Sequence, residues 1–141
     1  MPRPHKVGLD YFPLYVTLPE LEYIKGLYGM IGVQVIISLW QKIYQKNGYY
    51  IEYDNMSSVI FSNEFGEQLE RCFPSKNKQR WEIYDEIVHR AFEDGVFDKA
   101  MFDEYGILTS QRIQELYVFV KKKRAEELID ERYLLLSAPK N

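Results

Sequence analysis

The stretch IGVQVIISLWQKIYQ, residues 31–45, constrains the fold more than any other part of the chain. Its apolar residues do not keep to one side of a helix, because they stand at positions 31, 33, 35, 36, 37, 39, 40, 43 and 44. A helix that is apolar on nearly all sides belongs in the middle of a core. The charge-free run from Met30 to Trp40 is shorter than the about 20 residues that a membrane-spanning helix needs. We therefore expect a globular domain built around this helix.

Length and composition exclude several classes of protein. A chain of 141 residues with 46% apolar residues fits one domain. The net charge of -3 gives no bulk attraction to nucleic acid or anionic membranes, so either would need a local patch. A single cysteine, Cys72, excludes an internal disulfide framework and fits a reducing compartment. The beginning, MPRPHKVGLD, lacks the hydrophobic region of a signal peptide, so we expect a cytoplasmic protein.

Prolines and capping residues organise the beginning of the chain. Early prolines and a glycine predict an extended N-terminal arm over residues 1–16, with several apolar side chains able to lie on the domain: Leu9, Tyr11, Phe12 and Leu14. Thr17 and Glu20 have the spacing of a capping box. They predict a helix that Gly29 can close, ahead of the core helix described above.

The middle of the chain combines a strand with short helices. YYIEYD alternates in the way of a half-buried strand, which we place over Tyr49–Tyr53. Asp54 is then the N-cap of a helix of about ten residues that ends near Gly66. A short helix to Cys72 and a loop forced by Pro74 follow.

The strongest helical pattern in the chain lies between Lys78 and Asp94. Its apolar stripe has the spacing i, i+3, i+4, i+7, i+8 and ends at Gly95: Tyr84, Ile87, Val88, Ala91 and Phe92. In the next stretch, GVFDKAMFDEYGILTS, the dipeptides Val96-Phe97 and Ile107-Leu108 predict two paired strands with Phe97 and Leu108 buried. Met101 and Phe102 between them predict a short helical turn that folds back.

This order of elements predicts a mainly α fold of the α+β kind. We expect a winged helix-turn-helix domain with extra N- and C-terminal helices and a small antiparallel sheet. Residues 78–94 take the recognition-helix position and residues 95–110 the wing. A last helix, capped by Thr109 or Ser110, turns four side chains inward: Ile113, Leu116, Tyr117 and Val120. The resulting divisions are an arm (1–16), a winged-helix core (17–118) and a C-terminal helix and tail (119–141), within one domain overall.

Three segments carry a resemblance to a known family. RPHKVGLDYFPL, GYYIEY and GVFDKAMFDEYGILTS resemble, in order and spacing, the N-terminal domain of DnaD-like proteins of phages and prophages, a domain of unknown function. Tyr15 departs from the pattern, since an acidic residue usually follows FPL in that family. The resemblance covers about residues 3–118 and implies a module of replication initiation or primosome loading that binds DNA or partner proteins.

Charge on the predicted recognition helix argues against base reading. Its outward face collects Lys78, Glu82, Asp85, Glu86, His89, Arg90 and Glu93. Four carboxylates on this face would repel phosphates. The face is therefore either a solvated surface or a site for a basic partner protein at Glu82, Glu86, His89 and Glu93.

Cations gather elsewhere in the sequence. The turn before the recognition helix carries the best candidates for phosphate contacts, because the helix N-terminus also favours an anion: Arg71, Lys76, Lys78 and Arg80. Arg3 and Lys6 on the arm and Lys99 in the wing could assist. Solvated loop lysines are the alternative. The run KKKR at 121–124 is best interpreted as part of a solvated charged helix, because successive positions wind around the helix.

No catalytic or metal-binding motif accompanies these charges. The chain has two histidines and one cysteine, no Gly-rich phosphate loop and no Ser-centred nucleophile elbow. We expect neither an enzyme nor a cofactor. Two hypotheses remain: a weak DNA-binding replication module, and a protein-interaction or self-assembly module without DNA contacts. We favour the first only because the two roles can coexist. A homodimer through the apolar arm and the last helix is also expected.

Overall fold

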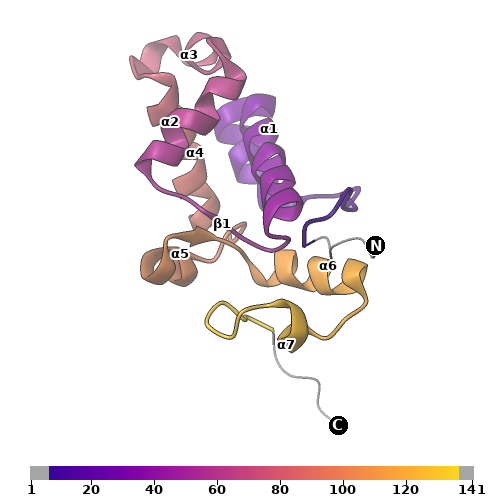
Figure 1. The fold of residues 1–141 in the computed structure, drawn as a ribbon. Coiled ribbons are helices and arrows are strands. Elements are labelled where there is room, and N and C mark those ends of the chain that lie inside the picture. The colour runs from indigo at the N-terminus through magenta and orange to yellow at the C-terminus, as the bar shows by residue number, and fades with distance from the viewer. Residues whose placement is uncertain (1–6, 137–141) are drawn as a thin grey trace, which may run out of the picture.

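The computed structural model describes residues 7–136. Within them the protein is mainly helical, with one small antiparallel sheet of two strands. Figure 1 shows α1, α2, α3 and α4 grouped at one end and α6 and α7 at the other, with the sheet between the two groups.

Helix α1 (Glu22–Lys46) is the core helix that the sequence predicts. Gly29 interrupts it with φ 71° and ψ -165°, so two helical segments meet there, as its predicted closing role requires. Side chains on nearly all sides of the second segment are buried, among them Val35, Ile36, Leu39 and Ile43. The core position of the central helix is thus confirmed.

The start of α1 and its length differ from the prediction. The capping box at Thr17 does not form: a 3-10 turn (Pro19–Leu21) precedes α1, and neither the turn nor α1 has a side-chain cap. Glu20 instead pairs with Arg112 of α6. The helical stretch Pro19–Lys46 is long and apolar enough, by length and composition alone, to cross a membrane. The sequence had not suggested this, because the charge-free run Met30–Trp40 is shorter than a membrane span. The buried side chains of the stretch belong to the core, an arrangement typical of a core helix.

The remaining helices of this end follow their sequence signals. Asp54 caps α2 (Asn55–Ser62) by accepting a hydrogen bond from the Ser57 backbone N–H at 2.9 Å. A 3-10 turn (Asn63–Phe65) then leads to α3 (Gln68–Cys72), and a second 3-10 turn (Pro74–Lys76) leads to α4 (Arg80–Glu93). The predicted apolar stripe of α4 is buried against α1 and α2.

The sheet corrects the predicted wing. Strand β1 (Ile51–Glu52) pairs with β2 (Ile107–Leu108), with Ile51 opposite Leu108. Val96-Phe97, expected to pair with β2, is not a strand, because its backbone N–H groups bond back to the Ala91 carbonyl at the end of α4. The segment after Phe97 still meets the segment after β2 through a backbone hydrogen bond, which Asp98 N–H donates to the Thr109 carbonyl at 2.7 Å.

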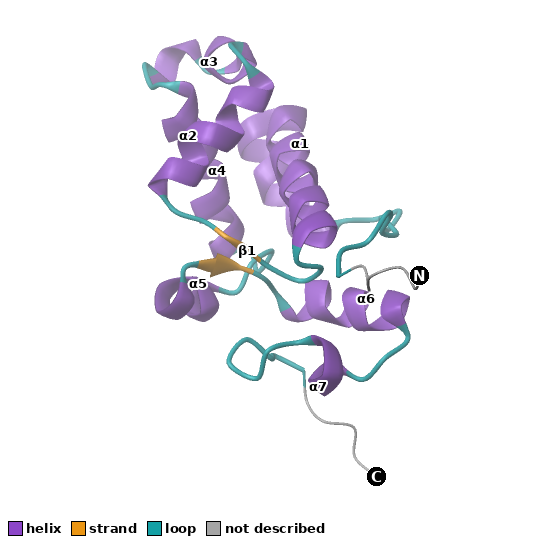
Figure 2. Cartoon of the chain, in the orientation of Figure 1, coloured by secondary structure: helices purple, strands orange, loops and turns teal. Residues whose placement is uncertain are grey.

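A helix occupies the place of the wing (Figure 2). The expected helical turn at Met101 and Phe102 is α5 (Lys99–Tyr105), capped by Asp98. Phe102 lies against Phe92 with ring centroids 4.7 Å apart, and is half-buried. Phe97 is buried as predicted, together with Leu108 of β2.

The segment after α6 (Gln111–Lys121) packs back on this helix. Ser110 caps it, and the predicted inward side chains Ile113, Leu116 and Tyr117 are buried, while Val120 is half-buried. The helix ends at Lys122, which has a left-handed backbone (φ 56°), so residues 121–124 do not continue on one helix as expected. A short helix, α7 (Ala125–Leu128), follows.

The N-terminal arm binds the two ends of the molecule together. The Leu9 backbone N–H donates to the Tyr44 carbonyl of α1 at 2.7 Å, and the Tyr117 hydroxyl of α6 donates to the Val7 carbonyl at 2.7 Å. A Cβ at Gly8 would lie 1.8 Å from the Gln45 carbonyl oxygen, so only glycine permits this approach. The predicted docking of the arm is confirmed at Leu9, which is buried, whereas Tyr11 is exposed.

Candidate functional site

The basic turn and the acidic helix, predicted as separate surfaces, meet at one carboxylate. Glu86 of α4 accepts a hydrogen bond from Lys76 Nζ at 3.0 Å and lies 3.6 Å from Lys78 Nζ. Lys76 also lies over the rings of Tyr28 and Phe73, at 5.5 and 5.9 Å from their centroids. The segment between α3 and α4 thus folds Lys76 and Lys78 onto the acidic face of α4.

Titration of this cluster follows from its contacts. Partial burial would raise the pKa of Glu86, but the hydrogen bond from Lys76 and the charges of both lysines outweigh burial and lower it. Burial, followed by the Glu86 carboxylate, raises the pKa of Tyr28 to about 12. Glu86 therefore stays ionised at neutral pH and holds both lysines.

The other cations predicted to contact phosphates also form ion pairs with carboxylates. Arg80 Nε lies 2.7 Å from Glu70 of α3, and Lys99 Nζ lies 3.0 Å from Asp103 in α5. Arg71, which the sequence placed in the turn, lies in α3 and pairs with Glu67 at 2.6 Å. Arg3 and Lys6 lie outside the described residues. Every predicted DNA-contact cation that the structure describes therefore forms an ion pair with a carboxylate of its own chain.

The remaining acidic candidates on α4 have structural partners. Glu82 accepts from the Gln79 backbone N–H as part of a capping box. His89 Nε2 lies 3.4 Å from Asp85, and Glu93 lies 3.0 Å from Arg90. Of these, His89 and Glu93 are exposed and Glu82 is half-buried. The predicted partner face thus has opposite charges beside its acids and is not a uniform acidic patch.

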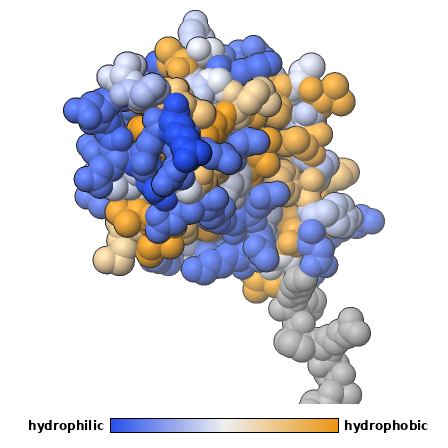
Figure 3. Space-filling view, turned by 90° about the horizontal axis from the view of Figure 1, so that it is seen from above, coloured by the Kyte–Doolittle hydropathy of each residue, from blue (hydrophilic) through white to orange (hydrophobic). Residues whose placement is uncertain are grey.

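Unpaired cations lie away from the predicted site. Among residues 7–136, five lysines and arginines form no ion pair: Lys25, Lys46, Lys122, Lys123 and Arg124. Figure 3, seen from above, shows hydrophilic side chains over the middle and left of that face and apolar ones along its right edge.

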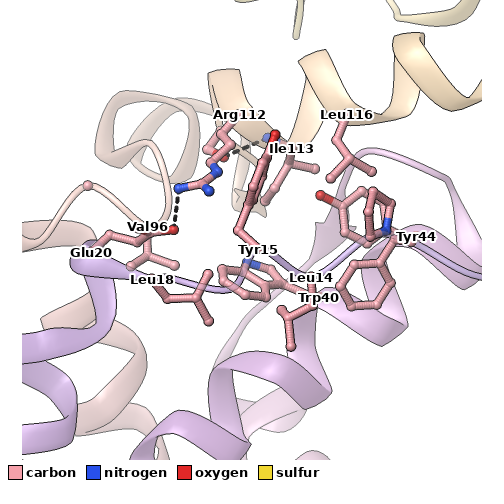
Figure 4. Close-up of a pocket in the computed structure, with 14 residues that line it drawn as sticks. Leu14, Tyr15, Leu18, Glu20, Trp40, Tyr44, Val96, Arg112, Ile113 and Leu116 are labelled. Atoms are coloured by element: carbon pink, nitrogen blue, oxygen red, sulfur yellow. Dashed lines mark hydrogen bonds and ion pairs between the residues drawn. The ribbon is translucent and has the colours of Figure 1, made fainter.

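An apolar cavity lies beneath the N-terminal arm. It has a volume of about 120 Å³ and opens between the arm, α1 and α6. Figure 4 shows the labelled side chains of these elements turned toward it, including Leu14, Leu18, Trp40, Tyr44, Ile113 and Leu116. A drug-sized ligand needs about 300 Å³ or more, whereas a cavity of about 150 Å³ holds one benzene ring. The cavity therefore fits a single large side chain.

A charged group fixes one rim of this cavity. The Arg112 guanidinium lies over the Tyr15 ring at 4.2 Å and pairs with Glu20 (Figure 4). Tyr15 and Leu14 are about half exposed, and Val16 is fully exposed. Sequence reasoning found the apolar arm but missed Trp40 and Arg112, because only the fold brings the end of α1 and the start of α6 together.

Among residues 7–136, no three His, Cys, Asp or Glu side chains lie close enough together to hold a metal ion. The cavity is lined mainly by apolar and aromatic groups, with one ion pair at its edge. Its construction suits contact with an apolar side chain.

Comparison with known proteins gives a family. The chain matches the family model described as Lin1244/Lin1753-like, N-terminal, over residues 11–113. A curated relative from Listeria innocua, the uncharacterized phage-related protein Lin1244/Lin1753, is 30% identical over 142 residues, which cover 99% of this chain and 42% of the relative. The chain thus spans less than half the length of that relative. No solved structure matches the chain. Because the family model covers most of its length, this chain belongs to the Lin1244/Lin1753-like, N-terminal family, which includes a phage-related protein.

Proposed function

We propose that the chain is a non-enzymatic, cytoplasmic module of a phage-type, DnaD-like replication protein that acts mainly by binding other proteins. Its fold would be a reduced winged helix, in which α2 and α4 form the helix-turn-helix pair and α5 replaces most of the wing. The phage-related relative supports the phage part of this proposal. The replication role rests on the resemblance of the three sequence segments.

One observation favours protein contacts over DNA contacts. Lys76, Lys78, Arg80 and Lys99 are each paired with a carboxylate of the same chain. A phosphate would have to displace these carboxylates and would meet their negative charge, so a phosphate contact there gains little. The apolar cavity, in contrast, is open and has the exposed ring of Tyr15 at its rim. Weak DNA binding through the turn remains the second role in this proposal.

The two roles can be separated by titrating duplex and single-stranded DNA at several salt concentrations. We expect a dissociation constant no tighter than about 10⁻⁴ to 10⁻⁶ M at physiological salt, with a slope of log affinity against log salt of about -3 or shallower. Changing Lys76, Lys78 and Arg80 together to glutamate should abolish this binding. Because the change also sets like charges beside Glu86 and Glu70, it should lower Tm, so circular dichroism has to verify that the variant is folded at the temperature of the titration. Nanomolar binding at physiological salt would contradict the assignment of protein binding as the main role.

A further inference from the structure

Trp40 carries an unused hydrogen-bond donor at the wall of the apolar cavity. Its side chain lines the cavity and is more than nine-tenths buried, with 8% of its surface exposed. Figure 4 shows this side chain turned toward the cavity. Its Nε1–H is shielded from solvent and has no hydrogen-bond partner in the described structure. A buried N–H without a partner is unfavourable, so an occupant that brings an acceptor gains a hydrogen bond that a purely apolar occupant cannot form.

The charged and capping groups beside the cavity are already paired. Arg112 pairs with Glu20 and lies over the Tyr15 ring at 4.2 Å. Ser110 Oγ accepts a hydrogen bond from the Ile113 N–H at 3.1 Å, as the cap of α6. The ion pair leaves no net charge on its side of the cavity, and the Glu20 carboxylate would repel a second carboxylate. The cavity therefore favours a neutral occupant that carries a hydrogen-bond acceptor.

Volume and lining narrow the occupant to one kind of side chain. The cavity volume of about 120 Å³ is close to the about 150 Å³ that holds one benzene ring. A phenylalanine or leucine side chain would fill the space but leave the Trp40 N–H unpaired. An asparagine or glutamine side chain brings two amide donors beside its acceptor, which apolar walls cannot satisfy. A tyrosine side chain brings one ring and one hydroxyl, whose oxygen can accept from Trp40 while its hydrogen faces the open side of the cavity.

The arm segment over the cavity is able to move aside. Phe12 stacks on Tyr44 with ring centroids 4.6 Å apart, which holds the arm just before this segment. Within the described structure, no backbone group of residues 13–17 forms a hydrogen bond. Tyr15 is about half exposed and Val16 is fully exposed. A shift of residues 13–17 can therefore open the way to the cavity without breaking a helix or the contacts that hold the arm.

We infer that the cavity receives a tyrosine side chain of a partner protein, with the tyrosine hydroxyl oxygen bound by Trp40 Nε1–H and residues 13–17 acting as a flap. This inference rests on the proposed role in protein binding and names the residue by which the partner is held. The exposed side chains of Leu14 and Val16 lie beside the entrance and can contact the residues that flank the tyrosine in the partner.

Side-chain analogues test the chemistry of the cavity. The compounds p-cresol and toluene have the shapes of the tyrosine and phenylalanine side chains and differ by one hydroxyl. In an isotopically labelled Trp81→Phe protein the only indole N–H resonance belongs to Trp40, so NMR reports its hydrogen bond directly. We expect p-cresol to bind with a dissociation constant about three- to tenfold below that of toluene. It should also move the Trp40 resonance downfield, as a new hydrogen bond does, whereas toluene should not.

Two variants separate the donor from the flap. Trp40→Phe removes the N–H and keeps an aromatic ring, so it should cancel the preference for p-cresol, with circular dichroism to verify folding. Tyr15→Ala changes an exposed side chain and should not prevent folding. In the Trp81→Phe background it should make the Trp40 fluorescence at least twofold more sensitive to acrylamide quenching. The matched control Tyr11→Ala, at an exposed tyrosine of the same arm that does not line this cavity, should leave the quenching unchanged.

Capped amino acids distinguish a partner's side chain from a free phenol. N-acetyl-tyrosine amide should shift the Trp40 resonance as p-cresol does, and N-acetyl-phenylalanine amide should not. Binding of p-cresol without binding of the capped tyrosine would overturn the assignment to a protein side chain. Equal affinities for p-cresol and toluene, an unmoved Trp40 resonance, or no binding of any probe would overturn the site itself. Nanomolar DNA binding at physiological salt would contradict the proposed protein role separately, because that measurement does not involve the cavity.

Discussion

The hydroxyl of Tyr84 gives a stability prediction of unusual sign. Tyr84 is fully buried on α4, and its Oη has no hydrogen-bond partner in the described structure. A buried hydroxyl without a partner costs about 1–3 kcal/mol. Tyr84→Phe removes that oxygen and keeps the ring, so we expect the free energy of unfolding to rise by about 0.5–1 kcal/mol after the loss of some packing is included.

Tyr53 supplies the matched control. Its hydroxyl donates to Asp85 at 2.9 Å, and the ring is equally buried. A hydrogen bond to a charged group is worth about 1.5–3 kcal/mol, and Asp85 is partly exposed, so Tyr53→Phe should cost about 1–2 kcal/mol. The same substitution is thus expected to act in opposite directions at two positions of one core.

Thermal and denaturant unfolding of both variants measure the difference. For a chain of this size, a change of about 1 kcal/mol moves Tm by about 2–4 °C. Burial, with a smaller contribution from Glu64, raises the pKa of Tyr84, so its folded form resists ionisation. The free energy of unfolding is therefore unaffected by this ionisation below the ordinary pKa of 10.0 and falls as the pH rises above it, because the unfolded chain can ionise Tyr84 and the folded chain resists it; Tyr84→Phe should weaken that alkaline loss. A Tyr84→Phe variant as destabilised as Tyr53→Phe would refute the reasoning.

Three further predictions test other parts of the structure. Glu86→Gln should strengthen DNA binding and steepen the salt slope by up to about 2, because each freed lysine can add one phosphate contact; an unchanged slope in the salt titration would contradict the pairing. Gly29→Ala should lower the free energy of unfolding by about 1–3 kcal/mol, because a φ of 71° is strained for alanine. Gly26→Ala, at a helical position with open space around a new Cβ, should raise it by about 0.5–1 kcal/mol. Denaturant unfolding measures both changes. Asp54→Ala should lower Tm at neutral pH, and the difference from the unchanged protein should vanish in acid. Hydrogen bonds from Ser57 lower the pKa of Asp54 in the folded protein. The stability that the Asp54 carboxylate contributes is therefore present above pH 3.8 and is lost as the pH falls through the pKa of the folded protein.

Local signals predicted the helices well and the sheet only in part. The stripe on α4 and the cap at Asp54 depend on neighbours within one or two turns, so spacing alone revealed them. Val96-Phe97 is as apolar as a strand, but its burial comes from the end of α4, where Gly95 turns the chain back toward Ala91. An apolar dipeptide predicts that its side chains are buried, but it does not predict which backbone groups its N–H and C=O groups bond to.

The candidate site was harder to predict, because its lysines are neutralised by carboxylates that are distant in the sequence and close only in the fold. Lys76 and Glu86 are ten residues apart, and the left-handed backbone at Asn77 helps to bring them together. Composition gave their charges but not their pairing. The arm was expected to lay apolar side chains on the domain, but the cavity beneath it also needs Trp40 and Arg112, which lie far apart in the sequence.

The docking of the arm bears on the order in which the chain can fold. The Val7 carbonyl and the Tyr117 hydroxyl that binds it are separated by 110 residues. During synthesis from the N-terminus, Val7 therefore emerges long before α6 exists, and the arm must wait until nearly the whole described chain is available. Closing so long a loop is slow compared with forming the local helices. We expect α2 and α4 to be structured early and the contact between the arm and α6 to form last, which makes that contact the natural starting point for unfolding as well.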